Sequence, residues 1–438
     1  MQKPSHLLIA CNECGLVSAI PNMEGSSKAS CPRCGHTLVR QVEGSPAKVQ
    51  AYGISCLVML TLSCVFPFMS FSASGISNNI SLMDVLEVFH TFDNNALAAM
   101  LLITIIVLPA IYISLVMFLF HVASKSSKGR GVNTRPSLLK QLSRLVFRVE
   151  IWLLVDIFLV GVIVSLVKIA ALADVELGAA FWAYCAYCAL VVFFSRAIDK
   201  EWLWENLFPS YPTGKVKPGD THLSGNHVAC RVCQQINDPH HKHCQRCDSR
   251  LHPYNPDMNI GWAWSFLISA IIFYVPANLY PMMYTVSLGS TERSTIMDGV
   301  ILLWNLGSYP IAAIIFIASV FVPMTKMLIM IWLLRAEKQG KEDDTNALKK
   351  LKYYRFTELI GRWSMIDVFV VAILSALVNL KGLMSISPGP AAFYFALVVF
   401  FTMCAALIFD PRVFWGPLRH RDHAASPPVL PSAAQPQE

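Results

Sequence analysis

The stretch FVPMTKMLIMIWLLR, residues 321–335, belongs to an apolar run that starts near Pro310 and contains one charge before its end, Lys326. A run of this length is long enough to cross a hydrocarbon core of about 30 Å as a helix. A charge inside such a helix costs at least about 2.5 kcal/mol on insertion scales, and it usually faces a partner or a water-filled cavity. The stretch therefore predicts a membrane span, and Lys326 requires an explanation.

Composition supports a membrane protein over the whole chain. Of 438 residues, 55% are hydrophobic and only 14% are charged, which is too apolar for an ordinary soluble enzyme. The net charge of +7 lies in loops between apolar runs, so it indicates membrane topology and not nucleic acid binding. The first forty residues are polar and hold two cysteine pairs, so no cleavable signal peptide is visible and we expect a cytoplasmic amino terminus.

Eight apolar stretches are candidate spans, and loop charges set their orientation. The loop 124–148 holds seven Lys or Arg and no acid, and the loop 335–355 holds seven bases and four acids. By the positive-inside rule these loops, and hence both termini, are predicted to be cytoplasmic. The spans are expected near 50–72, 96–121, 150–172, 178–198, 259–284, 308–334, 361–383 and 390–410.

The two halves of the chain are similar to each other. Pro67, Asp84 and Pro109 recur as Pro281, Asp298 and Pro323 at an offset of 214 residues. Farther along, Trp152, Asp156, Asp199 and Trp204 recur as Trp363, Asp367, Asp410 and Trp415 at an offset of 211. Each copy holds four predicted spans, an even number, so both copies are expected to enter the membrane in the same orientation, as a parallel repeat.

A cysteine quartet precedes each copy. Two CxxC turns let four thiolates converge on one tetrahedral ion, for which Zn²⁺ is the expected choice. Both quartets are complete and leave no position for a water, so structural zinc is favoured over a catalytic site, with a thiol redox switch as the alternative. His240, His241 and His243 lie beside the second quartet and are possible substitute ligands. The predicted ligands are Cys11, Cys14, Cys31 and Cys34, then Cys230, Cys233, Cys244 and Cys247.

The ordered motifs resemble the paraquat-inducible protein A family. They are CNECG and CPRCG at the amino terminus, NLYP at residues 278–281, the Met297-Asp298 pair, and a W-x-x-x-D-x-F pattern from Trp363 to Phe369. The resemblance covers nearly the whole chain apart from its tail. In the first half the NLYP turn reads CVFP, at residues 64–67.

The resemblance implies a multi-pass protein of the inner membrane of Gram-negative bacteria. It further implies a partner with MCE domains, which forms a hexameric tunnel across the periplasm, and phospholipid that is loaded into or taken out of that tunnel. Two alternatives remain: an exporter of small toxic compounds, and an anchor for the tunnel that transports nothing. An enzyme is not expected, because the sequence has no nucleophile with a placed base, no phosphate loop and no open metal site.

The repeat shows that buried polarity collects in the second copy. Lys326 and Ser319 correspond to Tyr112 and Ile105, and Ser364 and Thr402 correspond to Leu153 and Val191. At 1.5 Å per residue, Lys326, Thr402 and Asp367 are predicted to lie roughly 12, 12 and 8 Å below the cytoplasmic surface. The sequence therefore predicts a transport network of Lys326, Asp367, Ser364, Thr402 and Ser319.

Two readings of this network stay open. A lysine beside an aspartate could change protonation during transport and couple proton movement to lipid movement. Alternatively, the pair and its hydroxyl neighbours only lock three helices together, or the lysine snorkels.

The predicted fold class is an all-α polytopic membrane protein of two tandem four-helix modules, each preceded by a small cytoplasmic zinc ribbon. The predicted domains are a ribbon at 1–45, a transmembrane module at 46–210, a ribbon at 211–256, a second module at 257–415 and a disordered tail at 416–438.

Overall fold

The computed structural model describes most of the chain. The described residues are 7–21, 23, 25–73, 76–81, 102–129, 135–170, 174–208, 210–211, 216–287, 290–305, 307, 309–336, 344–363, 366, 369–370, 379–380, 384–416 and 429–431.

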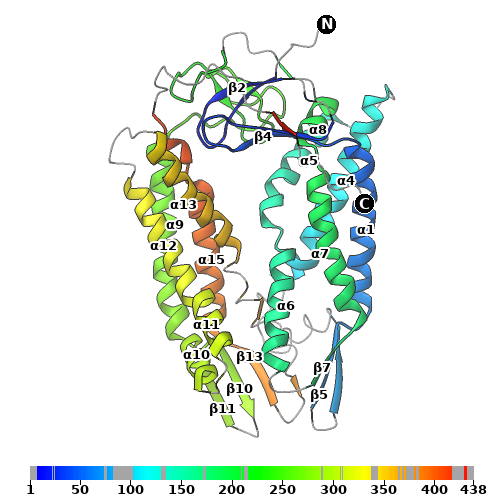
Figure 1. The fold of residues 1–438 in the computed structure, drawn as a ribbon, viewed down its shortest axis with the longest axis vertical. Coiled ribbons are helices and arrows are strands. Elements are labelled where there is room, and N and C mark those ends of the chain that lie inside the picture. Colours follow the sequence, from blue (N-terminus) through cyan, green and yellow to red (C-terminus); the bar gives the residue numbers. More distant parts are fainter. Residues whose placement is uncertain are drawn as a thin grey trace.

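Two upright helix bundles stand side by side, one from each half of the chain (Figure 1). In the first bundle α1 packs against α4 and α7, and in the second α9 packs against α12 and α15. The first bundle comprises α1 (Ser45–Val65), α4 (Leu108–Ser127), α5 (Pro136–Val149), α6 (Val155–Ala170), α7 (Ala179–Ala197) and α8 (Lys200–Leu207). The second comprises α9 (Pro256–Leu279), α10 (Ile296–Asn305), α11 (Tyr309–Phe316), α12 (Val322–Ala336), α13 (Asp344–Trp363) and α15 (Pro390–Ile408).

Among the described residues, six helices are long and apolar enough to cross a membrane: Ser45–Val65, Ile103–Ser127, Ala179–Ala197, Pro256–Leu279, Ile317–Ala336 and Pro390–Ile408. The predicted third span corresponds to α6, which has only 16 residues. The predicted seventh span, 361–383, lies largely outside the described residues. The first span was predicted to reach residue 72, but α1 ends at Val65, because Pro67 follows and the chain then forms a strand. Thus the mainly helical, duplicated membrane fold is confirmed.

A π-helix precedes the mid-span proline in both copies. Residues Ile103–Val107 (η1) come before Pro109, and residues Ile317–Phe321 (η3) come before Pro323. A proline cannot donate a backbone hydrogen bond, and the wider π turn shifts the helical hydrogen bonds to i→i+5 partners. In both copies the helix thus accommodates the proline with a π-bulge just before it.

Asp199 and Asp410, which occupy equivalent positions in the two copies, each cap the start of a helix. Asp199 caps α8 by accepting from the backbone N–H of Trp202, at 2.9 Å. Asp410 caps the short 3-10 helix η5 (Pro411–Phe414) by accepting from the N–H of Arg412, at 3.1 Å. Each side chain satisfies an N–H that the start of a helix leaves without a partner.

A small antiparallel sheet lies at one end of each bundle, the end opposite the amino-terminal strands (Figure 1). The sequence did not predict these sheets. In the first, β5 (Met69–Ala73) pairs with β6 (Ile76–Ile80) and β7 (Asp174–Leu177). In the second, β10 (Met283–Ser287) pairs with β11 (Ser290–Ser294) and β13 (Met384–Pro388), and β12 (Asn379–Leu380) extends it. Met69 faces Ile80 and Leu177, and Met283 faces Ser294 and Pro388, which are the positions that the two offsets of the repeat predict.

A glycine in each copy permits the sheet to join the bundle. Gly178 and Gly389 donate their N–H groups to Phe68 and Met282, at 3.1 and 2.8 Å. A Cβ at Gly178 would stand 2.1 Å from the carbonyl oxygen of Pro67, and one at Gly389 would stand 2.1 Å from that of Pro281. Only glycine lets the two backbones approach this closely.

Two cysteine ribbons lie together at the opposite end of the bundles (Figure 1). The first contains the hairpins β1 (Leu7–Ala10) with β2 (Val17–Ile20) and β3 (Ser27–Ser30) with β4 (Thr37–Gln41), and the second contains β8 (Val228–Ala229) with β9 (Ile236–Asn237). In the tail, for which the sequence indicates disorder, Val429–Pro431 form strand β14, antiparallel to β3.

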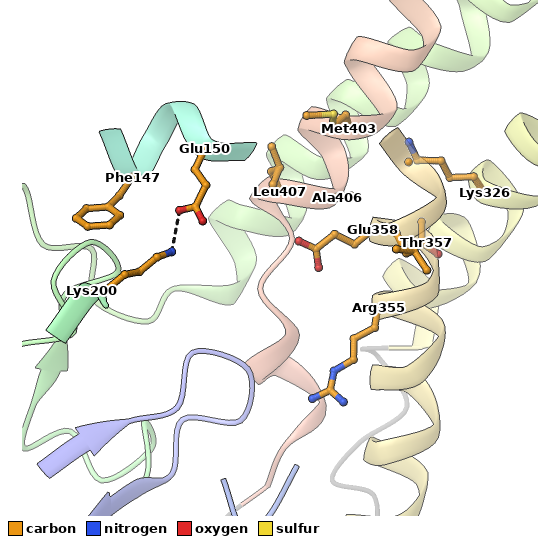
Figure 2. Close-up of a pocket in the computed structure, with 12 residues that line it drawn as sticks. Phe147, Glu150, Lys200, Lys326, Arg355, Thr357, Glu358, Met403, Ala406 and Leu407 are labelled. Carbon is orange, nitrogen blue, oxygen red and sulfur yellow. Dashed lines mark hydrogen bonds and ion pairs between the residues drawn. The ribbon is translucent and has the colours of Figure 1, made fainter. Parts of the chain in front are cut away.

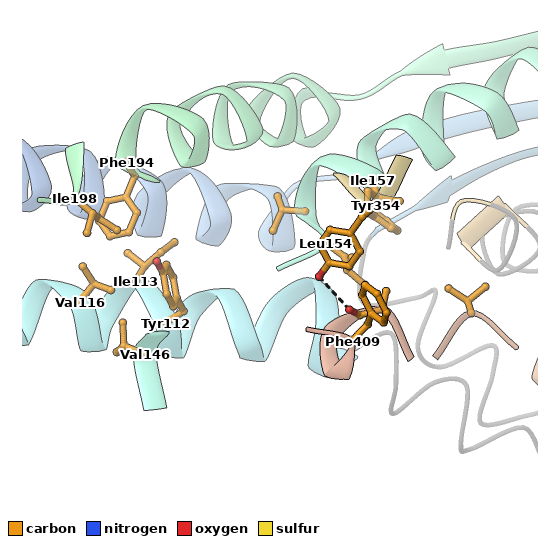
Figure 3. Close-up of a cluster of buried hydrophobic side chains, with 14 of the residues drawn as sticks. Tyr112, Ile113, Val116, Val146, Leu154, Ile157, Phe194, Ile198, Tyr354 and Phe409 are labelled. Atoms are coloured by element: carbon orange, nitrogen blue, oxygen red, sulfur yellow. Dashed lines mark hydrogen bonds between the residues drawn. The ribbon is translucent and has the colours of Figure 1, made fainter. Parts of the chain in front are cut away.

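The bundles are packed internally by aromatic side chains and touch each other through α6. Tyr112 contacts Phe194 in the first bundle, and Tyr354 contacts Phe409 in the second (Figure 3). Between the bundles, the ring of Phe158 meets that of Phe369 edge-on at 5.6 Å. A Cβ at Gly161 would stand 3.0 Å from the Cβ of Phe369, so α6 approaches the second bundle closely.

We expect Gly389→Ala to destabilise the protein, because its methyl group would force α15 away from the end of α9. Overpacking of this kind costs typically about 1–3 kcal/mol. Thermal unfolding in detergent measures the effect. Gly261→Ala on α9 is the matched control, because nothing lies within 4 Å of its added Cβ. An unchanged unfolding temperature for Gly389→Ala would contradict this account of the repeat.

Candidate functional site

Each cysteine quartet is assembled as the spacing predicts. The sulfurs of Cys11 and Cys34 lie 3.5 Å apart, as do those of Cys14 and Cys31. In the second quartet Cys230 and Cys247 are 3.6 Å apart, and Cys233 and Cys244 are 3.5 Å apart. All four ligand atoms of each buried quartet lie within 4.8 Å of one another. Tetrahedral Zn–S bonds of roughly 2.3 Å give sulfur–sulfur edges of about 3.8 Å, so both quartets fit such an ion.

The residue after each second cysteine adopts a left-handed conformation. Gly15 and Gly35 have φ values of 73° and 71°, and Gln234 and Asp248 have 57° and 58°. The second ribbon therefore forms the same turns as the first although it lacks the glycines that favour them. His240, His241 and His243 are in neither of the two ligand clusters found among the described residues.

Every CxxC turn carries a charged residue that contacts a helix bundle. Glu13 accepts from Arg355 of α13, with 3.2 Å from Nε to Oε1, and Arg33 donates to Asp344 at 2.8 Å. Arg231 pairs with Asp410 at 2.8 Å, and Arg246 pairs with Glu201 at 3.4 Å. The first ribbon thus rests on the second bundle, although it precedes the first bundle in the chain.

Charge at this contact affects Glu13. Burial alone raises the pKa of Glu13, but hydrogen bonds from His36 and Arg355 outweigh it, and the pKa falls below the ordinary value of 4.5. Glu13 is therefore ionised at neutral pH, as its contact with the Arg355 guanidinium requires.

Lys326 is buried in the second bundle, with 2% of its surface exposed. Its Nζ donates to the Oγ1 of Thr402 on α15 at 2.8 Å, and Thr402 in turn donates to the carbonyl of Val399 at 3.0 Å. A Cβ at Gly361 on α13 would stand 3.0 Å from this Nζ. Lys326 therefore lies where α12, α13 and α15 meet.

The lysine borders a cavity of about 510 Å³ between the two bundles. Lys326, Arg355, Thr357 and Glu358 line it from the second bundle (Figure 2). From the first bundle come Glu150 and Lys200, whose charged atoms are 2.7 Å apart. This volume lies within the roughly 300–1,000 Å³ of small-molecule sites, and the lining has both apolar and charged side chains.

Of the other predicted network residues, Ser319 is among the described residues, whereas Ser364 and Asp367 are not. Ser319 is 2% exposed and lies in the π-helix η3, which displaces it from the regular helical register that the prediction assumed. Ser364 and Asp367 lie outside the described residues, so their contact with Lys326 stays a prediction. Sequence reasoning did not find Glu150, Lys200 or Arg355. The first two begin the helices η2 (Glu150–Trp152) and α8, Arg355 lies inside α13, and no sequence pattern marks any of them.

The arrangement defines a multi-pass membrane protein built from a duplicated helical bundle, with two four-cysteine clusters that could each hold a metal ion at one end and a buried lysine in the second copy. The paraquat-inducible protein A family model matches residues 47–208 and 260–419, one match in each half. This chain belongs to that family.

Relatives extend over almost the full chain. Intermembrane transport protein PqiA of Escherichia coli K12 is 36% identical over 95% of this chain and 98% of its own length. A probable intermembrane transport protein of Haemophilus influenzae is 26% identical, over 95% and 97%. Lipophilic envelope-spanning tunnel protein A of E. coli K12 is 26% identical, over 92% and 90%. No solved structure matches this chain. Two of these relatives are thus named for intermembrane transport and the third for an envelope-spanning tunnel.

We expect the purified protein to hold two metal ions per chain, one for each four-sulfur cluster. Cys11→Ser and Cys230→Ser should each remove one ion, because a site that loses one of four thiolates binds the metal much more weakly. Metal analysis by mass spectrometry measures the stoichiometry. Cys185→Ser, a cysteine outside both clusters, is the control and should retain two ions. A metal content that both ligand variants leave unchanged would rule out these sites.

Proposed function

We propose that this chain is the inner-membrane subunit of a lipid transport system, and that it loads or unloads phospholipid at a periplasmic tunnel with MCE domains. Its relatives are named for intermembrane transport and for an envelope-spanning tunnel. The observation that carries the proposal is the buried Lys326 beside a cavity between two bundles, since a buried charge next to an accessible cavity is typical of transport pathways.

In this proposal both termini and both ribbons are cytoplasmic, as the basic loops predict, and the small sheets face the periplasm. The domain boundaries are those expected from the sequence, with membrane modules at 46–210 and 257–415. The metal in the quartets is Zn²⁺, because four buried thiolates favour it and no ligand position remains open for catalysis. Its role is structural: it holds the loops that contact α13 and α8.

Lys326, Thr402, Ser319, Ser364 and Asp367 form the proposed transport network. The first two are hydrogen-bonded, and Asp367 supplies the acid expected to accompany the lysine. A change in the protonation of Lys326 would break or form its contacts with α13 and α15, which gives proton movement a direct effect on the walls of the cavity.

Two other functions make different predictions. An exporter of toxic compounds would work without a tunnel partner, and an anchor would hold the tunnel without needing Lys326. Relatives named for transport between membranes favour the first proposal over both.

We expect Lys326→Met to abolish most lipid transport in cells while leaving thermal stability close to that of the parent protein. Replacing a buried charge by an apolar side chain of similar volume is often neutral or stabilising. Tyr112→Phe, at the equivalent position of the first copy, is the control and should retain activity. Full transport by Lys326→Met would make the lysine structural and would overturn the transport role of the network.

A second experiment addresses the partner. Purification of the tagged protein from its own bacterium should recover a large periplasmic MCE-domain protein and bound phospholipid, which mass spectrometry identifies. Recovery of the protein with neither would favour the exporter.

A further inference from the structure

A second cavity, the outer cavity, lies beside Lys326 between α12 and α13. Its volume is about 240 Å³, and the atoms that face it are all apolar. Thr325 and Ile329 of α12 and Phe356, Thr357 and Ile360 of α13 line it together with Lys326. Because the ammonium group of Lys326 bonds to Thr402, it is the aliphatic stem of the lysine that lies against this cavity.

The outer cavity opens beside an exposed apolar surface. Ile317, Phe321 and Phe356 contribute to its lining and are 51%, 57% and 49% exposed. Residues Ile317–Ala336 form one of the helices apolar enough to cross a membrane, so lipid chains surround this face. A pocket smaller than the roughly 300 Å³ of small-molecule sites takes one chain and not a whole lipid.

Aromatic and basic side chains follow the cavity toward the ribbon end. Trp332 of α12 and Tyr353 of α13 are exposed and meet edge-on at 5.5 Å. Exposed Lys349 and Lys352 lie farther along α13, and Lys352 is four residues, about 6 Å, from Phe356. Tryptophan and tyrosine gather at membrane interfaces, and lysines beyond them attract anionic headgroups. The order from apolar cavity to aromatic pair to cations matches the order of groups in an anionic phospholipid.

The first copy lacks the same arrangement. Tyr112 replaces the lysine there and is buried against Phe194, with ring centroids 6.3 Å apart. Leu138 and Gln141 stand at the positions of Lys349 and Lys352, at the offset of 211. At this offset, the flexible lysine stem and the two exposed lysines are therefore found in the second copy, whereas α5 of the first copy carries its cations at other positions, such as Lys140 and Arg144.

We propose that this outer cavity binds one acyl chain of an anionic glycerophospholipid from the leaflet on the ribbon side, with the headgroup phosphate held by Lys349 and Lys352. A bound chain packs against the stem of Lys326, so occupancy and the position of its ammonium group are coupled. The binding site stands without the transport role, because it requires only that α12 and α13 face the bilayer.

Photocrosslinking tests the site on the full-length protein. The probe is phosphatidylglycerol with a diazirine in one acyl chain, in vesicles that otherwise contain phosphatidylethanolamine. We expect crosslinks on peptides of α12 and α13 to saturate as the probe fraction rises, and unlabelled phosphatidylglycerol to compete with them. Crosslinks at the exposed Ile268 and Ile272 of α9 should rise linearly, as contacts with bulk lipid do.

Variants locate the chain and the headgroup. Ile329→Trp and Ile360→Trp fill the cavity and should reduce the α12 and α13 crosslinks several-fold. Leu328→Trp, on the same helix but 61% exposed and outside the cavity, is the matched control and should not. Lys349→Gln and Lys352→Gln should each weaken competition by phosphatidylglycerol about fivefold. Lys128→Gln, an exposed lysine at the end of α4, should leave it unchanged.

Linear, non-competed crosslinking of wild-type α12 and α13 would show bulk lipid only and would overturn the proposal, and this arm depends on no variant. The proposal would also be wrong if Ile329→Trp and Ile360→Trp crosslinked the probe as strongly as Leu328→Trp. Transport is not part of the readout. If the wild-type protein binds the probe saturably but transports no lipid in cells, the binding site stands and the transport proposal fails. If it transports lipid but crosslinks only in the linear manner of bulk lipid, the binding site fails and the transport proposal stands.

Discussion

A bilayer offers no hydrogen-bond partners, so the backbone polar groups inside it must be satisfied by the protein itself, and a charged side chain there needs a polar partner or a cavity. This constraint explains the long helices of both bundles and the π turns before Pro109 and Pro323. It also explains why Lys326 cannot stand alone: its ammonium group donates a hydrogen bond to Thr402, and the hydroxyl of Thr402 donates one to the carbonyl of Val399. In the part of the chain that the structure describes, the sheets, with open edges, lie at the ends of the bundles (Figure 1).

The two copies share the contacts that hold their backbones together, but they differ in an interior side chain. Gly178 and Gly389 make the same close approach, and Asp199 and Asp410 cap equivalent helices. At the equivalent interior position one copy holds an aromatic ring packed among others, and the other holds a lysine between two cavities. The scaffold tolerates this divergence because backbone contacts, and not the side chain at that position, hold each sheet to its bundle.

The ribbons connect parts of the chain that the membrane modules keep apart. Glu13 and Arg33, from the first ribbon, pair with Arg355 and Asp344 of α13, the helix that also carries Gly361 against Lys326. Partly exposed ion pairs of this kind are individually weak. Their effect is to place α13 relative to the first cysteine cluster, so that cluster and the lysine contact the same helix.

The sequence alone determined the membrane class, the parallel repeat and the two sulfur clusters, because hydropathy, fixed offsets and CxxC spacing are local or periodic signals. It also identified Lys326 and Thr402, since a polar residue stands out in an apolar run. Only the tertiary structure decided that these two bond to each other, that Glu150 and Lys200 line the same cavity as Lys326, and that the first ribbon rests on the second bundle. Those contacts join residues up to hundreds of positions apart, and their geometry depends on how two bundles pack, which no local pattern encodes.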